Sequence, residues 1–364
     1  MKRNEEKKRS AYMEWAKTRS SARFNLASSG LTSVTMAEFP LELAELEITG
    51  GGYGYGPLLE RISRHTGASV ESIVTAEGTS MANHLAMAAL LAPGDEVVIE
   101  KPTYGLLLDV ARYLGARIRR VGRDFENNFQ IRLPELKEAI TPATRLIVLS
   151  NLHNPSGALL SRETLGKIGE LAERVGARVL VDEVYLEMLF EPEPGSFSLG
   201  ENFLVTSSLT KAYGLSGLRC GWILAAPELA HRIWRLNDLF AATAAHPAER
   251  MAVMAFDHLA GFCERAQTLL TANRALLDSF LDSRLDLEVF RPPDGTVVFP
   301  RLTMGEPEKF FKLLREQYET SVVPGEFFEA PRHFRLGIGG PGANLAGGLE
   351  RLGAALDEFG RAGA

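Results

Sequence analysis

The sequence predicts an α/β protein built on a parallel, doubly wound sheet. Between about residues 70 and 225, short apolar runs such as EVVIE, RLIVLS and RVLV alternate with segments of helical period. This pattern is typical of strands that are buried on both faces and joined by crossover helices. Ligands of such sheets bind beyond the carboxyl ends of the strands. Polar residues that directly follow the apolar runs are therefore the first candidates for a site.

Composition excludes several functional classes. The chain has 364 residues, 45% of them hydrophobic, and a net charge of −6, which is enough sequence for a large core and does not favour a nucleic-acid partner. The N-terminal segment lacks the apolar core of a signal peptide, and no run is long and apolar enough for a membrane span. The two cysteines, Cys220 and Cys263, cannot build a disulfide framework or a zinc site. We expect a cytoplasmic protein.

The pattern of predicted secondary structure changes after the alternating segment. A long helical stretch at roughly 247–281 is followed by shorter strand-like runs, which predict a small α+β domain. We expect a large domain at 45–245, and a small domain formed by 1–44 together with 246–364. The first residues predict a helix or an arm, and packing of that arm on a partner subunit is the alternative.

Two polar clusters follow predicted strands directly. Asn154 lies in NLHNPSG, which is good turn chemistry and is explained equally by a plain loop. Asp182 follows the buried run RVLV, where a carboxylate needs a charged or hydrogen-bonded partner. Helix capping is one explanation for Asp182, and a ligand cation such as a protonated ring nitrogen is the other.

Two further clusters have the same placement. Gly78, Thr79 and Ser80 begin a predicted helix, and free N–H groups at such a start bind phosphate. An N-cap at Thr79 or Ser80 accounts for the same residues. Tyr104, in KPTYG, follows another strand and is explained equally well as a packing residue.

Other familiar sites are missing from the sequence. The loop GGYGYG lacks the G-x-G-x-x-G spacing of a dinucleotide site, and no strand precedes it. There is no Walker A sequence, and the seven histidines show no metal-binding spacing, so we expect no metal.

Taken together, the clusters resemble the class I/II aminotransferases, which are fold type I enzymes dependent on pyridoxal 5′-phosphate (PLP). The resemblance extends from NLASSG to FRLGIG, nearly the whole chain. It rests on the order and spacing of Asn154 in N-P-S-G, Asp182 and Tyr185 in D-x-x-Y, Ser208 and Lys211 in S-x-x-K, Arg219, and Arg335 in FRLG. The fold it implies has a large domain with a mostly parallel seven-stranded sheet and a small α+β domain.

The resemblance also implies roles around the cofactor ring. Lys211 would form a Schiff base with PLP, and Asp182 would keep the pyridine nitrogen protonated so that the ring withdraws electrons. Tyr185 and Asn154 would hydrogen-bond the ring 3′-oxygen. Tyr104 would stack on the ring face.

Further roles concern phosphate and substrate. Arg335 would clamp the substrate carboxylate through its planar fork of donors, with Asn154 and the loop at Gly30 beside it. Freed Lys211 would move the Cα proton as base and acid. The phosphate would be held by Gly78, Thr79, Ser80, Ser208 and Arg219.

The implied reaction moves an amino group between an α-amino acid and a 2-oxo acid. A C–S β-lyase or another lyase of this fold would use the same cofactor contacts and is the alternative. The family's shared active sites imply a homodimer. A regulator that binds PLP and DNA would need an extra domain, for which this chain has no room.

Two departures from the family pattern bear on the substrate and the interface. Family members usually carry a tyrosine a few residues before a glycine, and this tyrosine reaches the partner's phosphate. Tyr53 and Tyr55 stand closer to Gly56 than that usual spacing. Either tyrosine could serve, and Tyr53 is our candidate. A plain flexible loop is the alternative. Ala241 stands near the place where aspartate-specific members carry an arginine. We therefore expect a donor other than aspartate, with an aromatic or aliphatic side chain.

Overall fold

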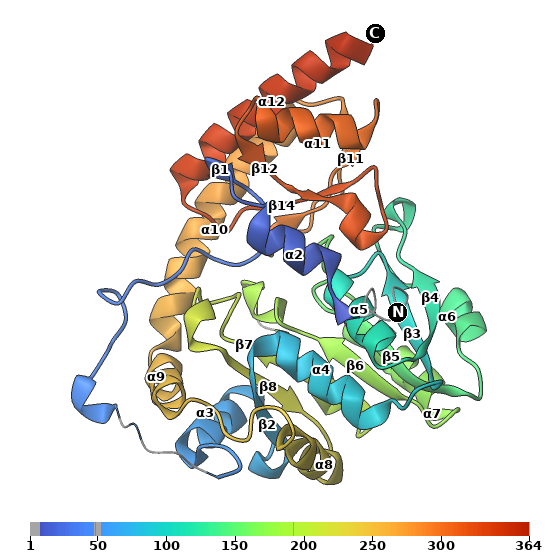
Figure 1. Ribbon diagram of the computed structural model, residues 1–364, viewed down its shortest axis with the longest axis vertical. Helices are drawn as coiled ribbons and strands as arrows, with labels where there is room; N and C mark the ends of the chain where they lie inside the picture. The colour runs from blue at the N-terminus through green and yellow to red at the C-terminus, as the bar shows by residue number, and fades with distance from the viewer. Residues whose placement is uncertain (1–7, 47, 49–51, 192, 364) are drawn as a thin grey trace.

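The fold places a large sheet below a smaller α/β layer, with one long helix linking the two (Figure 1). The computed structural model describes residues 8–46, 48, 52–191 and 193–363. Within those residues, no helix has the length and apolar character needed to cross a bilayer. The helices are α2 Ala11–Thr18, α3 Gly56–Thr66, α4 Gly78–Leu90, α5 Gly105–Tyr113, α6 Leu133–Ala139, α7 Arg162–Glu173, α8 Pro227–Asn237, α9 His246–Asp257, α10 Leu259–Asp282, α11 Pro307–Glu316 and α12 Gly342–Gly363.

A seven-stranded, mostly parallel sheet forms the centre, as predicted. Its order is β2-β8-β7-β6-β5-β3-β4, and only β8 runs antiparallel to its neighbours. The carboxyl ends of the six parallel strands therefore meet at one edge. The strands are β2 Ile73–Glu77, β3 Glu96–Lys101, β4 Arg117–Gly122, β5 Thr144–Ser150, β6 Arg178–Asp182, β7 Phe203–Ser208 and β8 Cys220–Leu224.

Helices cover both faces of the sheet. Alternate strand residues point to opposite faces, so Val148 packs with α4, α5 and α8, whereas Ile147 packs with α6 and α7. This two-sided burial is why the strands read as continuous apolar runs in the sequence. In Figure 1, α4 and α5 pass in front of the sheet.

The C-terminal part carries short strands around α11 and α12. The helical stretch predicted at 247–281 is two helices, because the chain turns at His258, where φ is −122° and ψ is 16°. Strand β1 near the N-terminus pairs in parallel with β12 of the C-terminal part. The domain limits at 45 and 245 stay a prediction. The short strands are β1 Phe24–Asn25, β9 Leu287–Glu288, β10 Val297–Val298, β11 Arg301–Leu302, β12 Thr320–Ser321, β13 Val323–Pro324 and β14 Phe334–Gly337.

A buried ion pair joins β3 to the residue that follows β4. Arg123 donates from Nη1 to Glu100 Oε2 at 2.7 Å, and both side chains are fully buried. Glu100 Oε1 accepts from the backbone N and the Oγ of Ser150, at 2.8 and 2.6 Å. Ser150 Oγ in turn accepts from the backbone N of Asn154 at 3.0 Å. The pair thus holds the turn that carries one predicted site residue.

We expect Arg123→Met to destabilise the protein by about 3–5 kcal/mol, because it leaves the Glu100 carboxylate buried without its cationic partner. The midpoint of urea unfolding measures this. Arg132→Met is the matched control: Arg132 pairs with Glu135 on the surface, so its loss should cost about 1 kcal/mol or less. Equal midpoints for the two variants would contradict the prediction.

Candidate active site

The predicted polar residues lie along one edge of the large sheet. Asp182 is the last residue of β6, and Ser208 is the last residue of the neighbouring β7. Asn154 lies on the turn after β5, on the other side of β6. Because β8 runs the opposite way, Arg219, which directly precedes it, lies at the same edge. The fold therefore gathers residues that are far apart in sequence.

Asp182 is held by a polar partner that sequence reasoning missed. Asn83, on α4, donates from Nδ2 to Asp182 Oδ2 at 2.8 Å, and its own Oδ1 accepts from Thr206 Oγ1 at 2.7 Å. The backbone N of Val184 donates to Asp182 Oδ1 at 3.1 Å. Burial nevertheless raises the pKa of Asp182 to about 6. The carboxylate caps no helix and would be stabilised by a cation.

Lys211 lies just beyond the end of β7 and faces the loop NLASSG. Its Nζ donates to Ser29 Oγ at 3.0 Å, and Ser29 also interacts with the hydroxyl of Tyr185. A Cβ on Gly30 would come within 3.2 Å of Lys211 Cδ, so the loop passes tightly over the lysine. Ser29 had no signal in the sequence beyond its position beside Gly30.

The surroundings of Lys211 disfavour its protonated form. Burial lowers its pKa below the ordinary value, and the positive charges of Arg335 and Arg219 act in the same direction. Tyr12 and Asp182 oppose this effect without reversing it. An amine of lowered pKa is a better nucleophile and base at neutral pH.

A cup of donors surrounds the start of α4. Gly78 has a φ of +76°, and a Cβ there would overlap Arg219 Nη2, so glycine is required for both reasons. Arg219 Nη2 donates to the carbonyl of Glu77 at 3.0 Å. Thr79 Oγ1 donates to Ser208 Oγ at 2.8 Å. These contacts bring the predicted phosphate ligands together.

The N-terminus of α4 has no side-chain cap. The helix begins at Gly78 with Glu77 as its N-cap residue, and no cap hydrogen bond forms. Thr79 and Ser80 therefore lie within the first turn, so the alternative of an N-cap at either residue is wrong. Uncapped N–H groups at such a position bind anions.

Arg335, on β14, is buried and only 1% exposed. Its Nη1 donates to Asn154 Oδ1 at 2.9 Å, and its Nη2 donates to Tyr12 Oη at 3.0 Å and to the carbonyl of Ala27 at 3.2 Å. Its Nε has no hydrogen-bond partner among the residues described. A buried guanidinium with an unused donor is suited to a carboxylate ligand.

Tyr12, on α2, is a site residue that sequence reasoning missed. Its hydroxyl accepts from Arg335, and its ring packs edge-on to Tyr104 with centroids 5.5 Å apart. Tyr104 is the N-cap residue of α5 and donates to Met13 Sδ at 3.6 Å. Helix α2 therefore lies against both the arginine and the predicted stacking tyrosine.

Tyr53 and Tyr55 do not join this cluster within one chain. Tyr53 Oη donates to Asp238 Oδ2 at 2.8 Å and is 47% exposed. Tyr55 Oη accepts from Arg250 Nη1 at 2.8 Å. Reach into a partner's site stays a prediction for both.

The comparisons with known proteins agree with this geometry. The family model for aminotransferase class I and II matches residues 40–352. The chain belongs to this family. PLP is the cofactor of this aminotransferase, as the sequence predicted.

Three relatives place this aminotransferase within its family. The chain is 32% identical over 295 residues to the arginine–pyruvate transaminase of Pseudomonas aeruginosa, covering 77% of this chain and 74% of that protein. A PLP-dependent aminotransferase from Streptococcus suis matches with a TM-score of 0.90 and 28% identity, over 96% and 97% of the two chains. The PLP-dependent cyclase OrfR matches with a TM-score of 0.86 and 25% identity, again over 96% and 97%.

The donors of this aminotransferase fit PLP. The amine of Lys211 has a lowered pKa, which favours reaction with an aldehyde, and the buried carboxylate of Asp182 forms no ion pair within the described part of the chain. The glycine at position 78 leaves room beside Arg219 and beside the free N–H groups of α4. These features suit an aldehyde, a protonated ring nitrogen and a phosphate respectively.

We expect Tyr12→Phe to raise the KM for the amino donor about tenfold and to change kcat little. The Tyr12 hydroxyl accepts from Arg335 and donates to no acceptor among the described residues, so its proton is available to a carboxylate held by the arginine. Steady-state kinetics measure both constants. Tyr318→Phe is the control, because that hydroxyl donates to Glu358, away from the site. A lower KM for Tyr12→Phe would mean that the hydroxyl occupies the carboxylate's place.

Proposed function

We propose that this aminotransferase takes its amino group from an α-amino acid other than aspartate, with an aromatic or aliphatic side chain preferred, and passes it to a 2-oxo acid. The observation that carries the proposal is the position of Lys211, a buried amine of lowered pKa that interacts electrostatically with Asp182, Arg219 and Arg335. The amino acid and the 2-oxo acid would bind to the same side chains, one after the other.

Asp182 and Lys211 would act on the cofactor. PLP, when bound, supplies an aldehyde that reacts with amines and a ring that withdraws electrons from the substrate Cα. Lys211 would hold it through Nζ. Asp182, oriented by Asn83, would accept a hydrogen bond from the ring nitrogen and keep it protonated, since a buried carboxylate is stabilised by such a cation.

Three further side chains would complete the hold on the cofactor ring. Tyr185 and Asn154 would donate to the 3′-oxygen, and Tyr104 would pack against the ring face. Support comes from the contacts of Tyr185 with Ser29, which accepts from Lys211, and of Asn154 with Arg335. The phosphate would be held by Gly78, Thr79, Ser80, Ser208 and Arg219.

Lys211 Nζ would also move the proton. The free lysine amine, with its lowered pKa, would take the proton from the substrate Cα and return it as an acid. Ser29 Oγ, 3.0 Å from Nζ, would keep the amine pointed into the site through the transfer. Orientation by the protein supplies much of the rate in such a step.

Arg335 would hold the substrate carboxylate, with Gly30 and Asn154 beside it. Its fork is fixed by protein acceptors on two nitrogens, so little freedom is lost when the carboxylate arrives. Ala241 stands near the place where aspartate-specific members carry an arginine, so this position supplies no second carboxylate clamp. The relative named arginine–pyruvate transaminase makes arginine and pyruvate useful members of any substrate screen.

A second candidate function is lyase or cyclase chemistry on an amino acid. The likeness to the PLP-dependent cyclase OrfR over 96% of this chain supports it. The same lysine, aspartate and phosphate contacts would serve such a reaction, and no second 2-oxo acid would be consumed.

We further propose that the enzyme is a cytoplasmic homodimer in which Tyr53 reaches the partner's phosphate. Leu239 and Phe240 support the dimer, because they precede the segment at Ala241 and are 78% and 50% exposed. Exposed apolar side chains at one place commonly mark an interface.

A spectral screen of amino donors tests the proposed reaction. Single turnovers with aromatic, aliphatic and basic amino acids should convert the visible absorbance of the lysine-bound cofactor to that of its amine form, and aspartate should convert it poorly. Lys211→Ala should abolish the reaction and the lysine-linked absorbance. Release of ammonia without a 2-oxo acid acceptor would favour the second candidate, and a wild type that binds no PLP would overturn both.

Analytical ultracentrifugation at micromolar concentration tests the dimer. We expect a mass of two chains for the wild type and a shift towards one chain for Leu239→Asp combined with Phe240→Asp, because both changes bring charge into an apolar contact. Met304→Asp, an exposed change on the C-terminal part, is the matched control. A monomeric wild type would contradict the proposal.

A further inference from the structure

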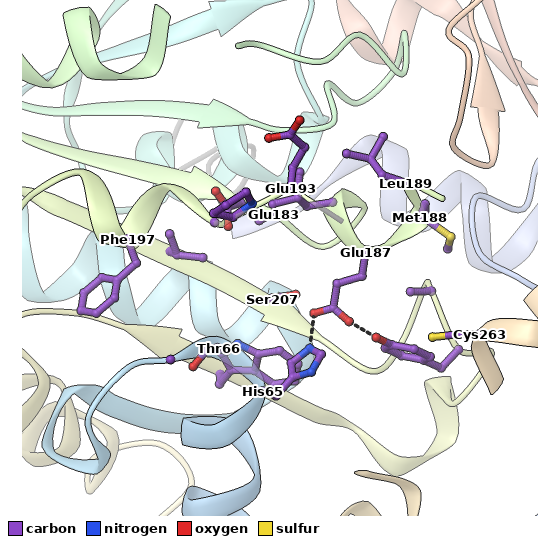
Figure 2. A pocket seen from close by; sticks show the side chains of 18 of the residues that line it. His65, Thr66, Glu183, Glu187, Met188, Leu189, Glu193, Phe197, Ser207 and Cys263 are labelled. Carbon is purple, nitrogen blue, oxygen red and sulfur yellow. Dashed lines mark hydrogen bonds and ion pairs between the residues drawn. The ribbon is translucent and has the colours of Figure 1, made fainter. Parts of the chain in front are cut away.

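A second cavity lies behind the site, on the opposite face of the sheet. It has a volume of about 750 Å³, within the range of small-molecule sites. Strands β7 and β8 form its floor through Val205 and Trp222, and α10 forms a side wall through Ala266 and Leu270. Figure 2 shows the segment after β6, with Glu187, Met188 and Leu189, across the opening.

Neighbouring residues of the same chain segments face the cavity on one side and the active site on the other. Ser208 contacts Thr79 on the side of α4, whereas its neighbour Ser207 lines the second cavity. In the same way Glu183, which follows Asp182, lines the second cavity. Successive residues of an extended chain point to opposite faces, so a ligand on one side would touch the backbone that carries the groups on the other.

Acidic side chains dominate the charge of this cavity. Its lining includes Glu183, Glu187 and Glu193, and contains no lysine or arginine among the described residues. His65 Nε2 contacts Glu187 Oε1 at 2.9 Å, and the Tyr213 hydroxyl donates to Glu187 Oε2 (Figure 2). The Glu187 carboxylate is thus fixed in orientation, and a carboxylate oxygen can accept more than one hydrogen bond.

Glu183 has an oxygen without a partner. Its Oε1 accepts from the backbone N and Oγ of Ser196, at 2.8 and 2.6 Å, but Oε2 has no hydrogen-bond partner within residues 8–46, 48, 52–191 and 193–363. The side chain is 5% exposed, and burial raises its pKa to about 7. A buried carboxylate in this position is stabilised by a cation.

The remaining walls are apolar and aromatic. Phe197, Leu224 and Leu270 line the space together with the indole of Trp222. An aromatic body would bury its surface there, and aromatic rings also attract cations.

We propose that this cavity is a second ligand site, which binds an organic cation with an aromatic body, places its ammonium group between Glu183 and Glu187, and is coupled through the shared strands to the cofactor site. The inference goes beyond the proposed reaction and does not depend on which donor the enzyme uses.

Calorimetric titration of the holoenzyme with N,N-dimethyl-2-phenylethylamine tests the proposal. This tertiary ammonium ion carries one N–H donor and cannot condense with the cofactor aldehyde. We expect saturable binding of one molecule per chain, and a concurrent shift in the visible absorbance of the bound cofactor. Neutral 3-phenyl-1-propanol should bind at least about tenfold more weakly, because it lacks the charge.

Variants of the lining separate this site from others. Ala266→Trp fills the cavity from α10 without changing charge and should abolish binding, whereas Glu187→Gln should weaken it about tenfold. Glu191→Gln, an exposed change on the same segment outside the lining, should leave it intact. No binding to the wild type, or undiminished binding to Ala266→Trp, overturns the proposal. Equal binding of the alcohol overturns its choice of a cation.

Discussion

The buried carboxylate of Asp182 constrains the arrangement of the site. Its burial at the end of β6 is unfavourable to the charged form, which is why its pKa rises to about 6 even with two hydrogen bonds in place. Asn83 and Thr206 extend the polar contacts into α4 and β7, so the helix and strand that carry the proposed phosphate ligands are tied to the carboxylate. A protonated ring nitrogen would offset the remaining free-energy cost of burying the Asp182 carboxylate. Binding of the cofactor should therefore stabilise the fold.

The sequence was sufficient to predict the sheet and to place the candidate site residues at its edge, because both follow strict local rules. Two-sided burial makes the parallel strands continuous apolar runs, and the strand-end rule then points to Asn154 and Asp182. Strand β4 escaped prediction because it is an edge strand, RIRRVG, whose exposed arginines interrupt the apolar pattern. Asn83 was missed since it lies mid-helix, where an asparagine carries no signal of its tertiary partner.

Alternation along the strands explains why this cavity and the proposed cofactor site lie back to back. One extended residue serves the cofactor side and the next serves the other side, as Ser208 and Ser207 do. The backbone of β7 is therefore common to both spaces, and so is the chain between Lys211 and Tyr213. A change in the contacts of Glu187 would be transmitted through Tyr213 over a distance of two residues in sequence. Coupling of this kind requires no large movement, since the packed backbone is the shared element.

The two halves of the site differ in how the chain assembles them. Within one chain, the residues proposed to contact the cofactor lie between 78 and 219, in the strands and helices of the large sheet and the turns that follow them. The carboxylate clamp instead joins Arg335 to Asn154 and to Tyr12, across sequence separations of 181 and 323 residues. Contacts of such separation carry a larger entropic cost than local ones, because they close long loops. Docking of α2 and of Asn154 onto Arg335 of β14 therefore carries a larger loop-closure cost than the contacts within the large sheet.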